Sequence, residues 1–159
     1  NLGLEHALSR VGVKLKRAAV GDRYVMEMML RHESTLGGES SGHIICRDRI
    51  ATGDGIVAAL QVMEIMQMSG KSLAELKQGM DKYPQCLVNV RLKERVDLNH
   101  FNQVQHLKVE IERELGDQGR VLLRSSGTEP LIRVMVEGVN GEQVQRLANQ
   151  LADAVSAAL

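Results

Sequence analysis

The residues best suited to chemistry lie in one polar run near the end of the chain, Arg124-Ser125-Ser126-Gly127-Thr128-Glu129-Pro130. Phosphate binds where donors are dense: a forked guanidinium, hydroxyl groups, and backbone amides that glycine allows to come close. This run offers all three, and Arg133 adds a second guanidinium a few residues later. It predicts a phosphate-binding loop. The alternative is a polar β-hairpin, in which Ser, Gly and Thr serve the turn and Arg124 is a solvated strand end.

A second polar loop occupies residues 37–43, with the sequence Gly-Gly-Glu-Ser-Ser-Gly-His. The carboxylate of Glu39 can accept two hydrogen bonds, and Ser41 can donate or accept, so the pair suits sugar hydroxyls. His43 would add a donor or a proton. The alternative is a solvated loop that leads into a strand, with His43 as an ordinary first residue of that strand.

The composition excludes several classes of protein. Lys plus Arg and Asp plus Glu each number 20, so no net charge attracts nucleic acid or an anionic membrane. Aromatic residues make up 2% of the chain, which leaves little surface for stacking on single-stranded nucleic acid. No apolar run approaches the roughly 20 residues that span a bilayer. The two cysteines, Cys46 and Cys86, are far apart, so we expect a reduced, cytoplasmic protein.

The first half of the chain alternates helix and strand patterns. Apolar residues predict a helix that ends at Gly12, a strand over residues 13–20, and a helix over 24–30 after a turn at Gly21-Asp22. A loop over 33–42 and a buried strand over 43–46 follow. A long helix capped by Thr52 or Asp54 reaches residue 68, and Ser72 with Glu75 forms the capping box of a short one. This alternation is typical of an α/β layer.

The second half has a different pattern, so we place a domain boundary at Tyr83-Pro84, giving domains of residues 1–82 and 83–159. Residues 86, 88, 90 and 92 alternate with more polar neighbours, which predicts a strand with one buried face. Helices are predicted over residues 99–115, ending at Gly116, and over 142–158. Two strands, 120–124 and 131–138, flank the phosphate-type loop. The order strand, helix, strand, strand, helix predicts a small α+β domain.

Two motifs, GGESSGH and RSSGTEPLIR, together resemble the α-D-phosphohexomutase superfamily, and VGDRYV at residues 20–25 is similar to its phosphoglucosamine mutase branch. The resemblance covers essentially the whole chain. It implies that the first domain is part of domain 3, starting after that domain's first strand. The second domain would be all of domain 4, an antiparallel sheet with two helices of the type found in TATA-binding proteins. Ser40 departs from the family pattern, which more often has Gln there.

The resemblance also implies residue roles. Glu39, Ser41 and His43 would bind sugar hydroxyls, and Arg23 would line the cleft. The substrate phosphate would be held by the residues Arg124, Ser126, Gly127, Thr128 and Arg133. The chemistry of the family runs through a phosphoserine and Mg²⁺, and the intact enzyme of the phosphoglucosamine mutase branch would interconvert glucosamine 6-phosphate and glucosamine 1-phosphate. The phosphoserine and carboxylate motifs do not occur in this sequence, so we expect no catalytic residue and no metal site in the chain.

Two alternatives stay open at this stage. The chain could belong to a phosphomannomutase or phosphoglucomutase, since nothing derived from its residues reads the amino group at C2 of the sugar. It could also be a non-catalytic interaction domain whose loops are ordinary turns. We expect a homo-oligomer formed through residues before Tyr83, because an incomplete sheet exposes an unpaired edge beside apolar side chains.

Overall fold

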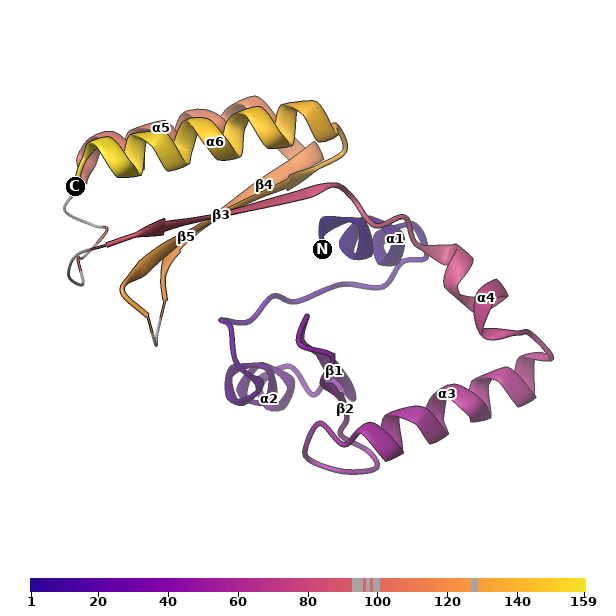
Figure 1. The fold of residues 1–159 in the computed structure, drawn as a ribbon. Helices are drawn as coiled ribbons and strands as arrows, with labels where there is room; N and C mark the ends of the chain where they lie inside the picture. The colour runs from indigo at the N-terminus through magenta and orange to yellow at the C-terminus, as the bar shows by residue number, and fades with distance from the viewer. Residues whose placement is uncertain (93–95, 97, 99–100, 127–128) are drawn as a thin grey trace. The chain divides into compact units, whose positions relative to one another are not determined.

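The computed structural model describes residues 1–92, 96, 98, 101–126 and 129–159. Its backbone forms two compact units (Figure 1). The C-terminal unit contains Asp81–Leu159 together with Asn1–Ala7, and the N-terminal unit contains Leu8–Met80. The division between them falls inside the first helix, α1, which spans Leu2–Arg10 and ends before Gly12, whose φ is +75°.

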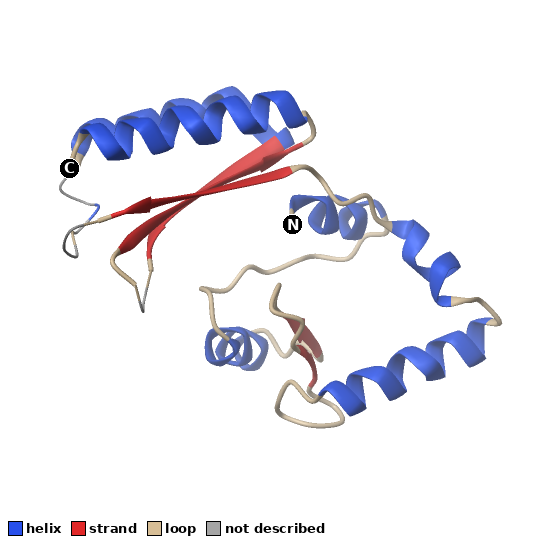
Figure 2. Ribbon diagram, viewed as in Figure 1, coloured by secondary structure: helices blue, strands red, loops and turns tan. Residues whose placement is uncertain are grey.

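The C-terminal unit is a three-stranded antiparallel sheet covered by two helices. The strands are β3 (Gln85–Arg91), β4 (Gly119–Ser125) and β5 (Leu131–Gly138), and β5 lies in the centre. Helices α5 (Asn102–Leu115) and α6 (Gly141–Ala157) lie side by side along the same face of this sheet (Figure 2). A short 3-10 helix, η3 (Gly116–Gln118), connects α5 to β4.

Strand alternation separates the two faces of this sheet. The covered face carries apolar side chains that pack with α5 and α6, among them Ile132, Val134 and Val136 of β5, each 0% exposed. The open face carries the residues in between: Gln85, Leu87, Asn89 and Arg91 of β3, Arg120, Leu122 and Arg124 of β4, and Leu131, Arg133, Met135 and Glu137 of β5. The side chains of Arg124 and Arg133 therefore lie on the face that the helices do not cover.

Local signals explain where these helices begin and end. Asn140 caps α6 by accepting a hydrogen bond from the backbone N–H of Gln143, and Gly116 ends α5 at a φ of +56°. The two helices are joined by Glu114, which accepts hydrogen bonds from Gln143 and Arg146. The bond from Gln143, followed by the contact with Arg146, lowers the pKa of the Glu114 carboxyl below its usual value.

The N-terminal unit contains helices around a two-stranded hairpin. Its elements are α2 (Asp22–Arg31), β1 (Leu36–Gly38), β2 (Ile44–Cys46), α3 (Gly55–Ser69), α4 (Leu73–Leu76) and η1 (Lys77–Gly79). Its buried apolar side chains are Met29, Ile45 and Cys46. The prediction for α3 is confirmed, since Asp54 caps it and Gly70 ends it in the left-handed region. The capping box of Ser72 and Glu75 is also confirmed.

Two sequence predictions in this unit were wrong. Residues 13–20 form no strand, and Val13 and Val20 are 49% and 61% exposed, because no strand of the described residues lies beside this segment to pair with it. The predicted loop over residues 33–42 contains the strand β1, which pairs with β2 from Leu36 with Cys46 to Gly38 with Ile44. The helix predicted after Gly21-Asp22 begins at Asp22, and its cap Gly21 makes no side-chain capping bond.

Candidate functional site

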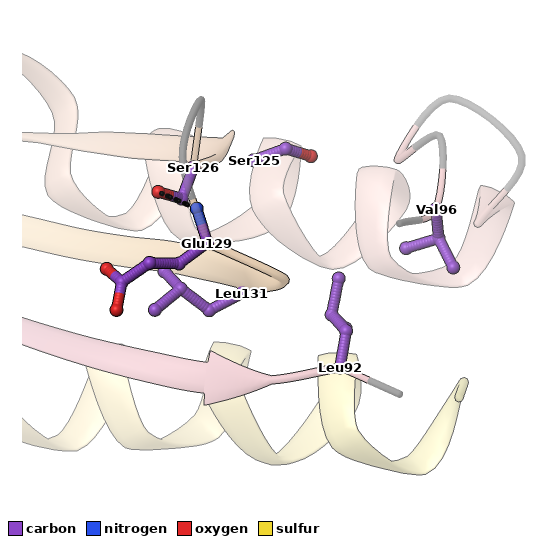
Figure 3. A pocket seen from close by; sticks show the side chains of 6 residues that line it. All are labelled: Leu92, Val96, Ser125, Ser126, Glu129 and Leu131. Carbon is purple, nitrogen blue, oxygen red and sulfur yellow. Dashed lines mark hydrogen bonds between the residues drawn. The ribbon is translucent and has the colours of Figure 1, made fainter. Parts of the chain in front are cut away.

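Three hydrogen bonds among its described residues hold the loop between β4 and β5. The backbone N–H of Ser126 donates to the carbonyl of Leu131 over 2.8 Å, and the N–H of Leu131 donates to the carbonyl of Glu129 over 2.9 Å. The Ser126 hydroxyl accepts from the N–H of Glu129 over 3.4 Å (Figure 3). A hydroxyl that accepts one bond keeps its proton for a second partner, so Ser126 can still donate to a ligand. Ser126 is buried, with 6% of its surface exposed.

A small cavity of about 160 Å³ lies beside this loop. Figure 3 shows its lining side chains, which come from the ends of β4 and β5, the loop between them, and the chain after β3: Leu92, Val96, Ser125, Ser126, Glu129 and Leu131. The cavity thus has polar lining from Ser125, Ser126 and Glu129 and apolar lining from the other three. Gly127 and Thr128, which the sequence predicts as phosphate ligands, lie outside the described residues.

Two guanidinium groups belong to one cross-strand pair at the base of the loop. Arg124 of β4 is in register with Arg133 of β5, so both side chains start from the same face of the sheet. Arg133 contacts Glu129 at 3.9 Å, and Arg124 forms no ion pair within the described part of the chain. Like charges directly opposite each other destabilise a sheet. An anion bound between the two groups would remove that penalty.

Two residues that the sequence did not single out share this face. Asn89 is in register with Arg133, so Asn89, Arg133 and Arg124 form one row across the three strands. Arg91 lies two residues further along β3, opposite Leu131 and diagonal to Arg133. The alternation of β3 indicated that both side chains are on its polar face. The sequence contained no signal for the register that brings them beside Arg133.

The second predicted loop is a preorganised turn around one carboxylate. Glu39 accepts hydrogen bonds from the backbone N–H of Gly21 at 2.8 Å and from the Ser41 hydroxyl at 3.2 Å. Its backbone pairs twice across the turn, donating to His43 and accepting from Gly42, whose φ is +98°. The side chain of Glu39 is 17% exposed. The carboxylate is therefore already oriented before any ligand arrives.

The three sugar-site residues that the sequence predicted lie together. The Ser41 hydroxyl is 2.9 Å from Nδ1 of His43, and that nitrogen is 3.8 Å from the Glu39 carboxylate. Because Ser41 donates to Glu39, the bond to His43 is made with Nδ1–H as the donor. In this arrangement the Glu39 carboxylate and Nε2 of His43 can each accept a hydrogen bond from a ligand hydroxyl.

Arg23, the weakest of the predicted site residues, lies in the same unit near this turn. It lines a hollow of about 190 Å³ with Asp22, Met26, Ile45, Ala51, Thr52 and Gly53. Its side chain is 81% exposed, and its guanidinium pairs with Glu27 at 3.0 Å. The pairing with Glu27 neutralises its charge in part, so Arg23 is a weaker anion ligand than Arg124. The role of Arg23 stays a prediction.

The described residues contain no group of three His, Cys, Asp or Glu side chains placed to hold a metal ion. No helix in the described ranges is both long and apolar enough to cross a bilayer.

The family of the chain follows from comparison with known sequences. Residues 1–83 match the family described as "Phosphoglucomutase/phosphomannomutase, alpha/beta/alpha domain III", and residues 87–154 match "Phosphoglucomutase/phosphomannomutase, C-terminal domain". The chain belongs to the phosphoglucomutase/phosphomannomutase family. The predicted fold class, an α/β domain III followed by a small domain IV, is thereby confirmed. The phosphohexomutase resemblance of the two motifs is confirmed as well.

Two similar curated relatives carry the same name. The chain is 68% identical to "Phosphoglucosamine mutase" of Methylococcus capsulatus and 57% identical to that of Nitrosococcus oceani, over 99% and 98% of its residues. It spans 35% of the length of each of these two relatives. Among solved structures it resembles Aspergillus fumigatus N-acetylphosphoglucosamine mutase, with a TM-score of 0.81 and 21% identity over 97% of this chain and 36% of that one.

A further structure of the phosphohexomutase fold contains a ligand. It is Aspergillus fumigatus N-acetylphosphoglucosamine mutase in complex with GlcNAc-6P and magnesium, which matches 68% of this chain and 22% of its own, with 26% identity and a TM-score of 0.54. The structural similarity at 21% identity establishes that this chain shares the fold of domains III and IV.

Proposed function

We propose that this chain is the sugar- and phosphate-recognition part of a phosphoglucosamine mutase, which interconverts glucosamine 6-phosphate and glucosamine 1-phosphate. The observation that carries the proposal is the pair of guanidinium groups of Arg124 and Arg133, in register at the base of a loop that can supply a further hydroxyl donor. The names of relatives 68% and 57% identical support the amino-sugar substrate.

The phosphate group of the substrate would lie at the loop between β4 and β5. Arg124 and Arg133 would each donate forked N–H bonds to its oxygens, and Ser126 would add its hydroxyl proton. Two permanent positive charges match the charge of a phosphate dianion. Gly127 and Thr128 complete the proposed set of ligands, as the family resemblance implies.

The sugar ring would lie against the turn of Glu39. Its carboxylate accepts from ring hydroxyls while Ser41 and His43 supply the hydrogen-bonded groups beside it. A carboxylate repels phosphate, so this turn would select the sugar and leave the phosphate to the arginines. Binding at two separate places would orient the substrate, and such orientation lowers the entropic part of the reaction barrier.

The reaction itself would use groups outside this chain. In the whole enzyme a phosphoserine would give its phosphoryl group to the free hydroxyl of the sugar, forming a sugar bisphosphate. The serine would then recover a phosphoryl group from the other position. Mg²⁺ would supply electrostatic stabilisation of the transferring group, held by carboxylates outside this chain. The work of the present residues is to bind and orient the substrate.

A calorimetric titration separates the two recognition loops. The ligands are glucosamine 6-phosphate and inorganic phosphate, and the variants are Glu39→Ala and, as a control, Glu142→Ala, an exposed carboxylate in the first turn of α6. We expect Glu39→Ala to weaken binding of the phosphosugar and to leave inorganic phosphate unchanged. Equal affinity of Glu39→Ala and the parent for both ligands would contradict the sugar site. If mannose 6-phosphate bound as tightly as glucosamine 6-phosphate, the result would contradict the proposal that the substrate is an amino sugar.

We also propose that the chain is cytoplasmic and self-associates through its N-terminal unit. Helix α3 supports the association, because none of its residues is buried although it is mostly apolar. Its exposed side chains include Ile56, Leu60, Met63 and Met68. A patch of this kind marks an interaction surface or an aggregation-prone one. Sedimentation at high micromolar concentration should show a dimer or larger species that Leu60→Lys dissociates, and a monomer would contradict the proposal.

A further inference from the structure

Glu137 is a charged residue with no exposed surface, and neither recognition loop uses it. It lies near the end of β5, on the open face of the sheet. Its carboxylate accepts a 2.5 Å bond from Nε of Arg120, which is the residue opposite it on β4. A buried carboxylate is tolerated only where ion pairing and hydrogen bonds replace its hydration. The Arg120 side chain supplies one such partner.

The other partners of Glu137 come from the opposite end of the sequence. The backbone N–H of Leu2 donates to Oε1 over 2.8 Å, and the side-chain amide of Asn1 donates to Oε2 over 3.1 Å. The first residue of α1 therefore presents its N–H group to a carboxylate of β5. The N-terminus of a helix favours such a negative charge. Figure 1 shows α1 on the side of this sheet opposite α5 and α6.

Tyr83 attaches the same turn at a second place. The Asn1 side chain accepts from the N–H of Tyr83 at 3.0 Å and donates to its carbonyl at 3.1 Å. The phenol of Tyr83 is 3.0 Å from Nδ1 of His6, and the two rings meet edge to face with centroids 5.5 Å apart. Close packing completes the attachment, since a Cβ on Gly3 would lie 2.0 Å from the carbonyl oxygen of Asp81.

We propose that Glu137 and Tyr83 make residues 1–7 a structural part of the C-terminal unit, although they lie in the segment that matches domain III. The joint between the two units would then have two crossings of the chain, one between Ala7 and Leu8 inside α1 and one between Met80 and Asp81. Any rotation of the C-terminal unit would carry the first turn of α1 with it. The sequence boundary at Tyr83-Pro84 would thus lie inside the rotating body.

Hydrogen exchange of the whole chain, followed by mass spectrometry, tests this assignment. In Glu137→Gln the new amide NH₂ faces groups that are all donors, so we expect the amides of residues 2–7 to exchange at least about tenfold faster. Exchange in α2 should stay as in the parent. Glu142→Gln, which changes an exposed carboxylate, is the matched control and should leave residues 2–7 protected.

Asn1→Ala examines the same attachment with Glu137 intact and carries the test if Glu137→Gln does not fold. It removes both bonds to Tyr83, one to Glu137, and the bond that the Asn1 side chain accepts from the backbone N–H of Gly3. We expect faster exchange of residues 2–7 and unchanged protection of α6. Unchanged exchange of residues 2–7 in the variants that fold would overturn the proposal. So would faster exchange of α2 together with residues 2–7, because it would assign this segment to the N-terminal unit.

Discussion

Replacing Arg124 with Gln should make the C-terminal unit more stable while it weakens phosphate binding. In the ligand-free chain Arg124 is directly opposite Arg133 and forms no ion pair among the described residues, so its charge contributes repulsion. Cross-strand pairs contribute roughly 0.2–1 kcal/mol. Both side chains are half-exposed, and solvent screening favours the lower half of that range. The variant should therefore gain a few tenths of a kcal/mol in free energy of unfolding.

The effect on binding has the opposite sign and is larger. A hydrogen bond to a charged group contributes about 1.5–3 kcal/mol, which corresponds to a roughly ten- to hundredfold loss of phosphate affinity. Phosphate at ten times its dissociation constant should stabilise the parent by about 1.4 kcal/mol. With tenfold weaker binding, the same concentration stabilises Arg124→Gln by only about 0.4 kcal/mol. The order of stabilities should therefore reverse when phosphate is added.

Urea unfolding followed through the amide resonances of α6 measures this reversal, because α6 and Arg124 both belong to the C-terminal unit. Arg113→Gln is the control, because Arg113 is an exposed arginine of α5 outside the loop. It should change neither the stability nor the response to phosphate by more than about 0.5 kcal/mol. The reasoning is refuted if Arg124→Gln is less stable than the parent without ligand and phosphate stabilises the variant as much as it stabilises the parent.

Three further predictions concern other parts of the chain. Leu151→Ala, in a side chain that is 0% exposed, should destabilise the C-terminal unit by about 3–5 kcal/mol, whereas Leu60→Ala on α3, 54% exposed, should cost less than about 1 kcal/mol; urea midpoints compare them. Hydrogen bonds from the hydroxyl of Ser72, and to a smaller extent from its N–H, hold the pKa of Glu75 below its ordinary value of 4.5. The stabilisation that this carboxylate gives α4 should therefore be complete above pH 4.5, and it should be lost as the pH falls through the lowered folded-state pKa. Carbon-13 titration of Glu75 checks this, and Ser72→Ala should return its pKa towards 4.5. Finally, the chain alone should show no mutase activity at any Mg²⁺ concentration, and turnover above the uncatalysed rate in a coupled assay would contradict the assignment of the chemistry to groups outside it.

Signals within a few residues predicted most of the C-terminal unit. Alternation predicted β3, the apolar stripe from Phe101 to Leu115 predicted α5, and Gly116 predicted its end. Such signals are reliable because capping and amphipathicity are local properties. The strand predicted over residues 13–20 failed for the complementary reason. A strand is stabilised by a neighbour, and no neighbour among the described residues pairs with this one.

The residues of the two candidate loops could be read from the sequence, but their geometry could not. Residue type suggested Arg124 and Glu39 as ligands, and the family resemblance added Ser126. The sequence did not reveal that the Glu39 carboxylate accepts from Gly21, or that the Ser126 hydroxyl already accepts one hydrogen bond. Each of these depends on a turn whose conformation fixes the partner. The burial of Glu137 was likewise unpredictable, because its partners Asn1 and Leu2 are separated from it by nearly the whole chain.

The central claim is that this chain recognises a phosphosugar through two loops, and a chemical-shift titration with glucosamine 6-phosphate tests it most directly. We expect weak binding, on the order of millimolar, because the remaining substrate contacts of the proposed enzyme lie outside this chain. The amides of residues 124–133 and 39–43 should shift together with a single dissociation constant, and inorganic phosphate should shift the first group alone. Shifts confined to other residues, or identical shifts in Arg124→Ala and the parent, would contradict the account.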